Sequence, residues 1–331
     1  MRTVVYGAGA VGGVIGGRLF EHGHEVVMIA RGAHYDALRD RGLRLESPAG
    51  ATTLAVPVVD HPGAIELRED DVVMLAMKGQ DTPGALHALA AHAPPGTAVV
   101  CAQNGVENER AAARLFANVY GICVMCPTGH LEPGVVQAYS LPVSGILDIG
   151  RYPAGVDDVA TGVAAALTAS TFVSEPRPDI MRWKYCKLLM NLGNAIQALC
   201  GAGASGADLY KLAREEGRAV LEAAGIDRAS TEEDRARRGD LLQMGRIGDG
   251  DRGGGSSWQS LARGTGAIEA DYLNGEIALL GRLHGVPTPV NATLQRLANQ
   301  AAADRLPPGH MTPEALLDAI ARQSDGLLRQ E

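Results

Sequence analysis

The sequence predicts an α/β protein in which a doubly wound parallel sheet is followed by an all-helical domain. Through about residue 150, short Val-rich runs alternate with helical stretches at the spacing of βαβ units. From about Pro178, apolar residues recur at helical spacing instead. The 331 residues therefore divide into expected domains of residues 1–175 and 176–331, each long enough to bury a core.

Five apolar runs are expected to form the parallel strands. They are residues 2–6, 25–30, 71–77, 98–102 and 120–125. Proline and glycine punctuate the links between them. Residues 134–150 follow as a strand-like segment that we expect to be antiparallel.

The second domain is expected to consist of helices. Their predicted ranges are residues 180–200, 209–224, 231–244, 260–284, 290–303 and 313–323. Between two of them, residues 245–257 form a glycine-rich run whose backbone freedom predicts a mobile loop, placed where it could cover a site.

Composition and charge argue against several classes of protein. Lys+Arg 30 against Asp+Glu 38 gives a formal net charge of −8, so nucleic acid is not an expected partner. Charged residues interrupt every apolar run before the roughly 18 residues that a membrane span requires. Met1 and Arg2 lead directly into a strand rather than a signal peptide. We therefore expect a cytoplasmic protein without a membrane partner.

The cysteines suggest reduced thiols rather than a disulfide framework, because they are few and scattered. Cys123 and Cys126 form a lone CxxC motif with only His130 nearby. Two small residues buried in a strand explain this motif better than a metal site does, and no metal is expected.

A dinucleotide-binding fingerprint follows the first strand directly and opens a helix. Its residues are Gly7, Ala8, Gly9, Ala10, Val11 and Gly12. The glycines suit a tight turn, close approach of the backbone to a pyrophosphate, and close packing of helix on sheet, with the helix N-terminus facing the anion. We expect these residues to bind a dinucleotide, in preference to a purely structural glycine turn.

Arg31 indicates which dinucleotide is bound. An acidic residue at the end of the second strand would accept the ribose hydroxyls of NAD, but here Arg31 and Gly32 follow that strand. A guanidinium can bind a 2′-phosphate through parallel hydrogen bonds, which favours NADP(H). The alternative is a solvated arginine at a strand end.

Lysine is rare in this chain, with four lysines among 30 basic residues. Unlike a guanidinium, an ammonium group can release its proton, so a lysine can act as a general acid. On a helix, Asn191 lies at about 40° and Asn194 at about −20° from Lys187, so the three share one face. This face indicates a buried polar site, with hydrogen bonds between the domains as the alternative.

Lys78 and Asn104 each follow a predicted strand. The carboxyl ends of strands form the ligand crevice of an open α/β sheet, so we expect both residues near the nicotinamide half of the cofactor. Either residue alone would equally suit an ordinary turn.

Together, these motifs resemble the ketopantoate reductase (2-dehydropantoate 2-reductase) family over essentially the whole chain. The resemblance rests on the glycine fingerprint, Lys78, Asn104-Gly105, Trp183 with Lys187-x-x-x-Asn191, and the run from Glu269 to Gly275. It implies a Rossmann domain with a helical domain, and NADPH-dependent reduction of a 2-oxo acid to a 2-hydroxy acid. The implied substrate is ketopantoate, in pantothenate biosynthesis.

The resemblance also implies roles for single residues. Lys187 matches the family's catalytic lysine, and Glu269 matches the glutamate that would orient it. Asn104 would take part in catalysis and hold the nicotinamide or the substrate. The residues implied to bind substrate are Asn191, Asn194, Ser257 and Asn274. A solvated helix charge at Glu269 and an ordinary N-cap at Ser257 are the alternatives.

This sequence departs from the family pattern at Ala195, where many members have a second asparagine, and before Glu269, where residues 264–268, ending at Ile268, lack basic residues. A paralogue that reduces another 2-oxo acid is therefore one alternative. An opine-type or 3-hydroxyacid-type dehydrogenase and a non-catalytic NADP(H)-binding sensor are the others. The long apolar helices suit a homodimer interface as well as an ordinary core.

Overall fold

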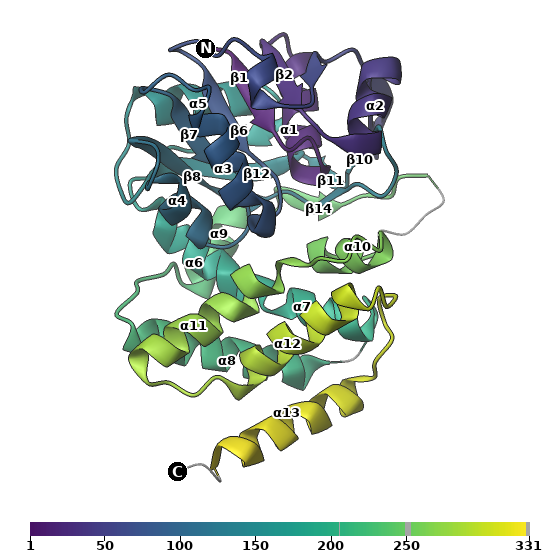
Figure 1. Cartoon of the computed structure of the whole chain (residues 1–331), viewed down its shortest axis with the longest axis vertical. Coiled ribbons are helices and arrows are strands. Elements are labelled where there is room, and N and C mark those ends of the chain that lie inside the picture. The colour runs from purple at the N-terminus through teal and green to yellow at the C-terminus, as the bar shows by residue number, and fades with distance from the viewer. Residues whose placement is uncertain (205, 249–252, 329–331) are drawn as a thin grey trace. The chain divides into compact units, whose positions relative to one another are not determined.

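The computed structural model describes residues 1–204, 206–248 and 253–328, which divide into two compact units (Figure 1). Unit 1 comprises Met1–Lys184 and Ala229–Arg252, and unit 2 comprises Tyr185–Arg228 and Gly253–Glu331. Unit 1 thus extends beyond residue 175 and takes in a later segment that we assigned to the helical domain. The helix α6 (Ile180–Asn191) begins in unit 1 and ends in unit 2.

The five predicted parallel strands are confirmed in unit 1. They are β1 (Thr3–Tyr6), β2 (Val26–Ile29), β6 (Val72–Leu75), β7 (Ala98–Cys101) and β8 (Asn118–Met125). Among the described residues the sheet has the strand order β13-β12-β8-β7-β6-β1-β2-β5, with β5 (Val58–Val59) and β13 (Phe172–Val173) at its edges. β12 (Gly145–Arg151) pairs antiparallel with β8, as expected for that part of residues 134–150.

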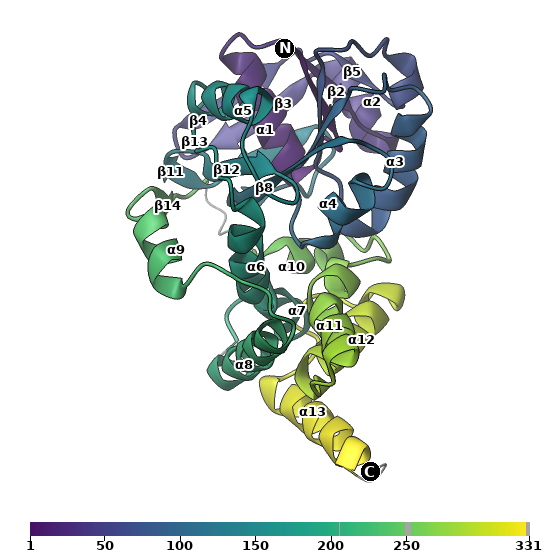
Figure 2. The ribbon, with the colours of Figure 1, turned by 90° about the vertical axis from the view of Figure 1, so that its left-hand side faces the viewer.

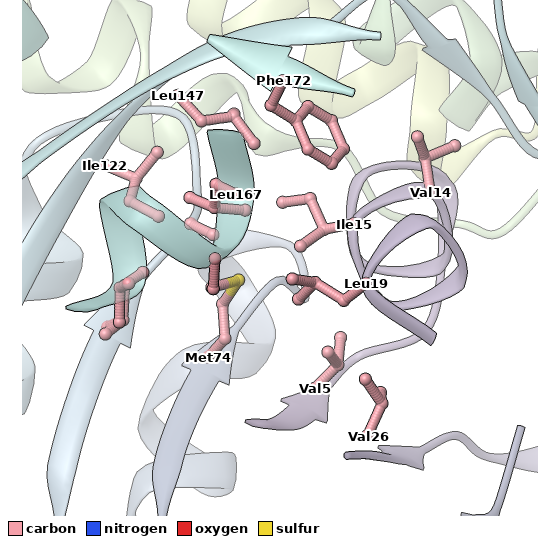
Figure 3. Close-up of a cluster of buried hydrophobic side chains, with 14 of the residues drawn as sticks. Val5, Val14, Ile15, Leu19, Val26, Met74, Ile122, Leu147, Leu167 and Phe172 are labelled. Carbon is pink, nitrogen blue, oxygen red and sulfur yellow. The ribbon is translucent and has the colours of Figure 1, made fainter. Parts of the chain in front are cut away.

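Helices cover both faces of this sheet, which is why its central strands are apolar throughout. One face carries α1 (Ala10–Glu21) and α5 (Asp158–Thr168), and Figure 3 shows Ile15, Leu19 and Leu167 packed among Met74 and Ile122 of the sheet. The other face carries α3 (Thr82–Ala90) and α4 (Glu107–Ala112). The helix α2 (Gly32–Arg41) follows β2.

Two smaller sheets complete unit 1. β4 (Gly50–Leu54), β3 (Leu43–Ser47), β10 (Val135–Ala138) and β9 (Thr128–Gly129) form one of them, in that order. β10 is antiparallel to β9 but parallel to β3, so the expectation of an antiparallel segment holds only in part. β11 (Ser140–Pro142) and β14 (Leu242–Met244) form the other small sheet.

The prediction of a helix over residues 231–244 is wrong after residue 238. α9 (Thr231–Arg238) ends at Gly239, which has a φ of 45°, and β14 then pairs antiparallel with β11 (Figure 2). The backbone N–H of Gly245 donates to the Tyr139 carbonyl at 2.8 Å. The predicted mobile loop therefore begins on an ordered segment, and its residues 249–252 lie outside the described residues.

An ionic cluster attaches α9 to the sheet of unit 1. Asp148 on β12 is buried and accepts hydrogen bonds from Arg237 on α9 at 2.6 and 2.8 Å and from Arg177 at 2.9 Å. Burial by itself raises the pKa of Asp148, but the two guanidinium groups outweigh that effect and hold the pKa below its usual value.

We expect Asp148→Asn to lower the free energy of unfolding by about 3 kcal/mol at neutral pH, because it breaks a buried ion pair. The folded-state pKa of Asp148 is lowered, so this stabilisation is present above its unfolded pKa, near ~3.9, and is lost as the pH falls through the folded pKa. Urea unfolding of both proteins at several pH values measures the difference.

The control for this prediction is Asp70→Asn, because the Asp70 side chain is 67% exposed. It should change the stability by less than about 0.5 kcal/mol. A stability difference between wild type and Asp148→Asn that stays constant on acidification would contradict the account.

The described part of unit 2 contains helices and no strand. They are α7 (Gly193–Cys200), α8 (Ala207–Ala223), α10 (Ser256–Ala262), the 3₁₀ helix η3 (Glu269–Tyr272), α11 (Asn274–His284), α12 (Pro289–Ala303) and α13 (Pro313–Leu328). None of the described helices is both long and apolar enough to cross a membrane.

Two predicted helices are interrupted in the structure. The predicted helix over residues 180–200 is α6 followed by α7, with Leu192 between them. Gly193 lies so close to the Tyr210 ring that a Cβ would not fit. The predicted helix over residues 260–284 is α10, η3 and α11, because Gly264 and Gly266 adopt positive φ values of 60° and 77° that end α10.

Candidate active site

Four neighbouring parallel strands of unit 1 end at one edge of the sheet, in the order β7-β6-β1-β2. Their registers pair Tyr6 with Leu75 and Leu75 with Cys101, so the strand ends are level. The predicted cofactor residues follow these ends: the glycine loop after β1, Arg31 after β2, Lys78 after β6 and Asn104 after β7. The structure therefore brings this part of the predicted site together.

The three glycines of the fingerprint differ in what requires them. Gly7 has a φ of +100°, and a Cβ there would lie 2.6 Å from the backbone nitrogen of Met77. A Cβ at Gly12 would collide with the Gly7 carbonyl oxygen. At Gly9, no described atom beyond its two neighbours in the chain lies within 4 Å of a Cβ position. The fold itself thus requires Gly7 and Gly12, whereas Gly9 leaves open space at the N-terminus of α1, where a pyrophosphate would lie.

His34 is a further residue at the glycine loop, and the sequence patterns did not reveal it. The backbone N–H of Gly134 donates to its Nδ1 at 2.9 Å, and its Nε2 lies 2.7 Å from the Ala8 carbonyl oxygen. Because Nδ1 accepts, Nε2 must carry the proton and donate to Ala8, which defines a neutral tautomer. The His130 ring lies 4.3 Å away, centroid to centroid. His34 thus ties the glycine loop to the loop before β10.

Arg31 stands at the N-cap of α2, and its side chain is 80% exposed. It pairs with Asp81 at 2.9 Å, in the 3₁₀ helix η2 (Gly79–Asp81) after β6. An exposed ion pair of this kind contributes about 0–1 kcal/mol, so the guanidinium can exchange Asp81 for a phosphate at little cost.

The lysines differ in their environments. Lys211 on α8 is 71% exposed and pairs with Glu215 one helical turn away. Lys184 is buried with Glu109 of α4, and its Nζ lies 2.6 Å from Oε1 of that residue. Burial raises the pKa of Glu109, while the Lys184 ammonium opposes the rise. Lys187, one turn after Lys184 on α6, is half-buried.

In unit 2, α6 carries Lys187 and the buried Asn191 on one face, as predicted. Asn194 belongs to α7, beyond the one-residue interruption at Leu192, whose φ of −57° and ψ of −27° are still helical, so the shared face with Lys187 stays a prediction. The Asn194 Oδ1 lies 3.6 Å from the Cβ position of Gly255, the N-cap of α10. Asn194 therefore lies near the start of the helix that carries Ser257.

The remaining predicted residues of unit 2 are buried. Ser257 lies in α10, and Glu269 begins η3. Burial lowers the pKa of Arg263, while the charge of Glu269 opposes that shift, so the two groups are electrostatic neighbours. Glu269 is therefore not a solvated helix charge, and Ser257 is not the N-cap of its helix, because Gly255 holds that position.

Asn274 has a structural task that we did not expect from the sequence. Its side chain is fully buried, and its Nδ2 donates to the Leu192 carbonyl at 3.1 Å and to Asn291 Oδ1 at 3.0 Å. It thereby binds the backbone where α6 gives way to α7. Its amide helps to hold the carboxyl end of the helix that carries Lys187 and Asn191.

Comparison with known proteins identifies relatives of both parts of the chain. Residues 3–153 match the family model "Ketopantoate reductase PanE/ApbA", and residues 179–302 match the model of its C-terminal part. The 2-dehydropantoate 2-reductase of Halobacterium salinarum is 29% identical, with 92% of this chain and 100% of that protein covered. The enzyme of the same name from Pyrococcus horikoshii is 30% identical, over 58% of this chain and 61% of that protein.

A solved structure extends the likeness to the fold. It is a PanE/ApbA family ketopantoate reductase from Ralstonia eutropha, 28% identical, with a TM-score of 0.76 over 92% of this chain and 99% of that one. The match of both family models, in the order of the two predicted parts, covers most of the chain. The chain therefore belongs to the ketopantoate reductase family and is an oxidoreductase that acts on a CH–OH group.

Proposed function

We propose that this protein reduces a 2-oxo acid to the corresponding 2-hydroxy acid with NADPH, and that ketopantoate is its substrate. The observation that carries the proposal is the shared sheet edge. Four adjacent strands end there and are followed by Gly9, with its open space, and by Arg31, Lys78 and Asn104. The names of the relatives support the substrate class.

The residues present fit NADP(H). Gly9 leaves space for a pyrophosphate, and the glycine loop places backbone N–H groups at the start of α1. Arg31 provides a cation where a 2′-phosphate would lie, and its present partner is a weakly held carboxylate. Lys78 follows β6, the neighbour of β1, and Asn104 follows β7, the next strand, on the side where the nicotinamide half is expected.

When bound, NADPH supplies a hydride to the keto carbon, and negative charge develops on the carbonyl oxygen. A positioned ammonium group stabilises this charge and donates the proton that completes the hydroxyl group. We assign that task to Lys187, with Glu269 as the group that orients it through a charge-assisted hydrogen bond. Asn104 holds the nicotinamide or the substrate, and Asn191, Asn194 and Ser257 bind polar groups of the substrate.

The choice between cofactors can be tested at Arg31. We expect Arg31→Ala to weaken NADPH binding by about 10- to 100-fold, the range for losing hydrogen bonds between charged groups, and to leave NADH binding nearly unchanged. Titration of the cofactor's fluorescence measures both affinities. Arg39→Ala is a matched control, because Arg39 on α2 is, like Arg31, an exposed arginine that pairs with carboxylates. Equal losses for both cofactors would show that Arg31 does not bind the phosphate.

The reaction itself can be tested by isotope transfer. With NADPH deuterated at C4 of the nicotinamide, the 2-hydroxy acid should carry deuterium at C2, as measured by mass spectrometry.

The same test shows whether two departures from the family matter. Ala195 and Ile268, where the chain departs from its family, are both buried apolar residues of unit 2. Transfer to ketopantoate would show that these substitutions are tolerated. Transfer only to another 2-oxo acid would identify the paralogue instead.

A further inference from the structure

Three buried polar side chains connect the loop that carries Lys78 to the loop that carries Asn104. They are Gln103, Thr82 and Asn108, and we call them the loop network. Gln103 Nε2 donates to the Thr82 hydroxyl at 2.8 Å, and that hydroxyl donates to Asn108 Oδ1 at 2.9 Å. The Thr82 hydroxyl thus acts as both acceptor and donor, and it is the middle link of the network.

Both ends of the loop network hold backbone next to the predicted cofactor residues. Gln103 Nε2 also donates to the Met77 carbonyl at 2.9 Å, and Met77 directly precedes Lys78. Asn108 Nδ2 donates to the carbonyl of Asn104 itself at 3.0 Å. The network therefore crosses from the segment after β6 to the segment after β7 and fixes the backbone at each.

These hydrogen bonds connect the two segments at a point where β6 and β7 are no longer paired. The paired register of β6 and β7 ends at Leu75 and Cys101, before Lys78 and Asn104 are reached. Beyond the strands, the loop network supplies side-chain hydrogen bonds between the two segments. Because its members are buried, water competes weakly with these bonds, and each polar group would be costly to leave unpaired.

Lys184 attaches the same network to α6. Its Nζ donates to the Gln103 carbonyl at 2.9 Å and to the Ile122 carbonyl at 3.3 Å, while Glu109 pairs with it. Gln103 is thus held through its backbone by Lys184 and through its side chain by Thr82. Lys184 precedes Lys187 by one turn of this helix.

We propose that Thr82, Gln103 and Asn108 are positioning residues that set the spacing of Lys78 and Asn104, and that they align the nicotinamide half of the cofactor for hydride transfer. This inference rests on the proposed function. The residues touch each other and the loop backbone rather than the reacting atoms. Loss of the network should therefore impair the chemical step much more than binding of the cofactor, whose phosphate groups we place at the glycine loop and Arg31.

Thr82→Val tests the inference, because it removes the hydroxyl group and nearly keeps the shape of the side chain. We expect kcat to fall about 10- to 100-fold, the range for a small misplacement of reacting groups, with the KM for NADPH changed by less than about threefold. Thr82→Ser keeps the hydroxyl and should restore most of kcat. Thr97→Val is the matched control: Thr97 is fully buried just before β7, and its Oγ1 has no hydrogen-bond partner among the described residues.

Hydrogen exchange gives a readout that does not depend on activity. Thr82→Val should speed amide exchange in residues 78–82 and in residues 104–108 together, whereas Thr97→Val should affect neither segment. An unchanged kcat, or faster exchange in only one segment, would overturn the inference. If the wild-type enzyme reduced no 2-oxo acid, the proposed function would fail. Joint acceleration of exchange in both segments would then support the coupling of the loops, and its absence would overturn it.

Discussion

Replacing Lys187 with alanine should lower kcat by at least ~10²-fold without unfolding the protein, because a general acid contributes about that much to the rate. Lys187 is half-buried on α6 and shares a face with the buried Asn191. Steady-state kinetics with NADPH and the best 2-oxo acid measures the loss, and circular dichroism checks the fold. Turnover near the wild-type value would remove Lys187 from the mechanism.

Two further variants separate proton donation from charge at this position. Lys187→Arg keeps the positive charge but cannot release a proton near neutral pH. It should therefore remain about as slow as Lys187→Ala if the proton matters, and recover if charge alone suffices. Lys211→Ala is the matched control, because Lys211 is exposed on α8 and pairs with the exposed Glu215. It should keep the wild-type kcat.

Gly9→Ala should weaken dinucleotide binding at least ~10-fold and leave the fold at least as stable as before. No described atom beyond the two neighbours in the chain lies within 4 Å of a Cβ at this position, so the methyl group enters the space that we assign to the pyrophosphate. Replacing glycine at a compatible position also stabilises by about 0.4–1 kcal/mol through the unfolded chain. Fluorescence titration with NADPH and thermal unfolding measure the two effects.

Gly12→Ala should have the opposite effect on stability and serves as the contrast to Gly9→Ala. A Cβ at Gly12 would collide with the Gly7 carbonyl oxygen, so this variant should lose about 1–3 kcal/mol of stability, the usual cost of overpacking. If Gly9→Ala bound NADPH as tightly as the wild type, the pyrophosphate would not lie against this loop.

The parallel sheet could be predicted because its strands are covered on both faces and therefore read as continuous apolar runs. β14 could not be predicted in this way. Its pairing with β11 joins residues about a hundred positions apart and leaves no local pattern. The return of α9 to unit 1 is accompanied by the contact of Arg237 with Asp148, which only the folded chain reveals. Local periodicity also predicts one helix where the structure has α6 and α7, because the residue between them, Leu192, keeps helical dihedrals of −57° and −27°.

The candidate site likewise contains residues that the sequence predicts and residues that only the folded chain shows. Arg31, Lys78 and Asn104 could be found because each follows a strand, and parallel strands end at one edge. His34, Gln103, Thr82 and Asn108 could not be found, because their hydrogen bonds form only in the folded chain. His34, Gln103 and Asn108 bond backbone carbonyls, and Thr82 bonds the side chains of Gln103 and Asn108. The structural role of Asn274 could not be predicted either, because its amide donates to the Leu192 carbonyl, between α6 and α7.

The most direct test of the proposed activity is the initial rate of NADPH oxidation by the purified protein, with ketopantoate and with a panel of other 2-oxo acids at matched concentration. We predict rapid, saturable oxidation that depends on the 2-oxo acid and is fastest with ketopantoate. Binding of NADPH without oxidation by any acid of the panel would contradict the proposal and point to a cofactor-binding protein without this chemistry.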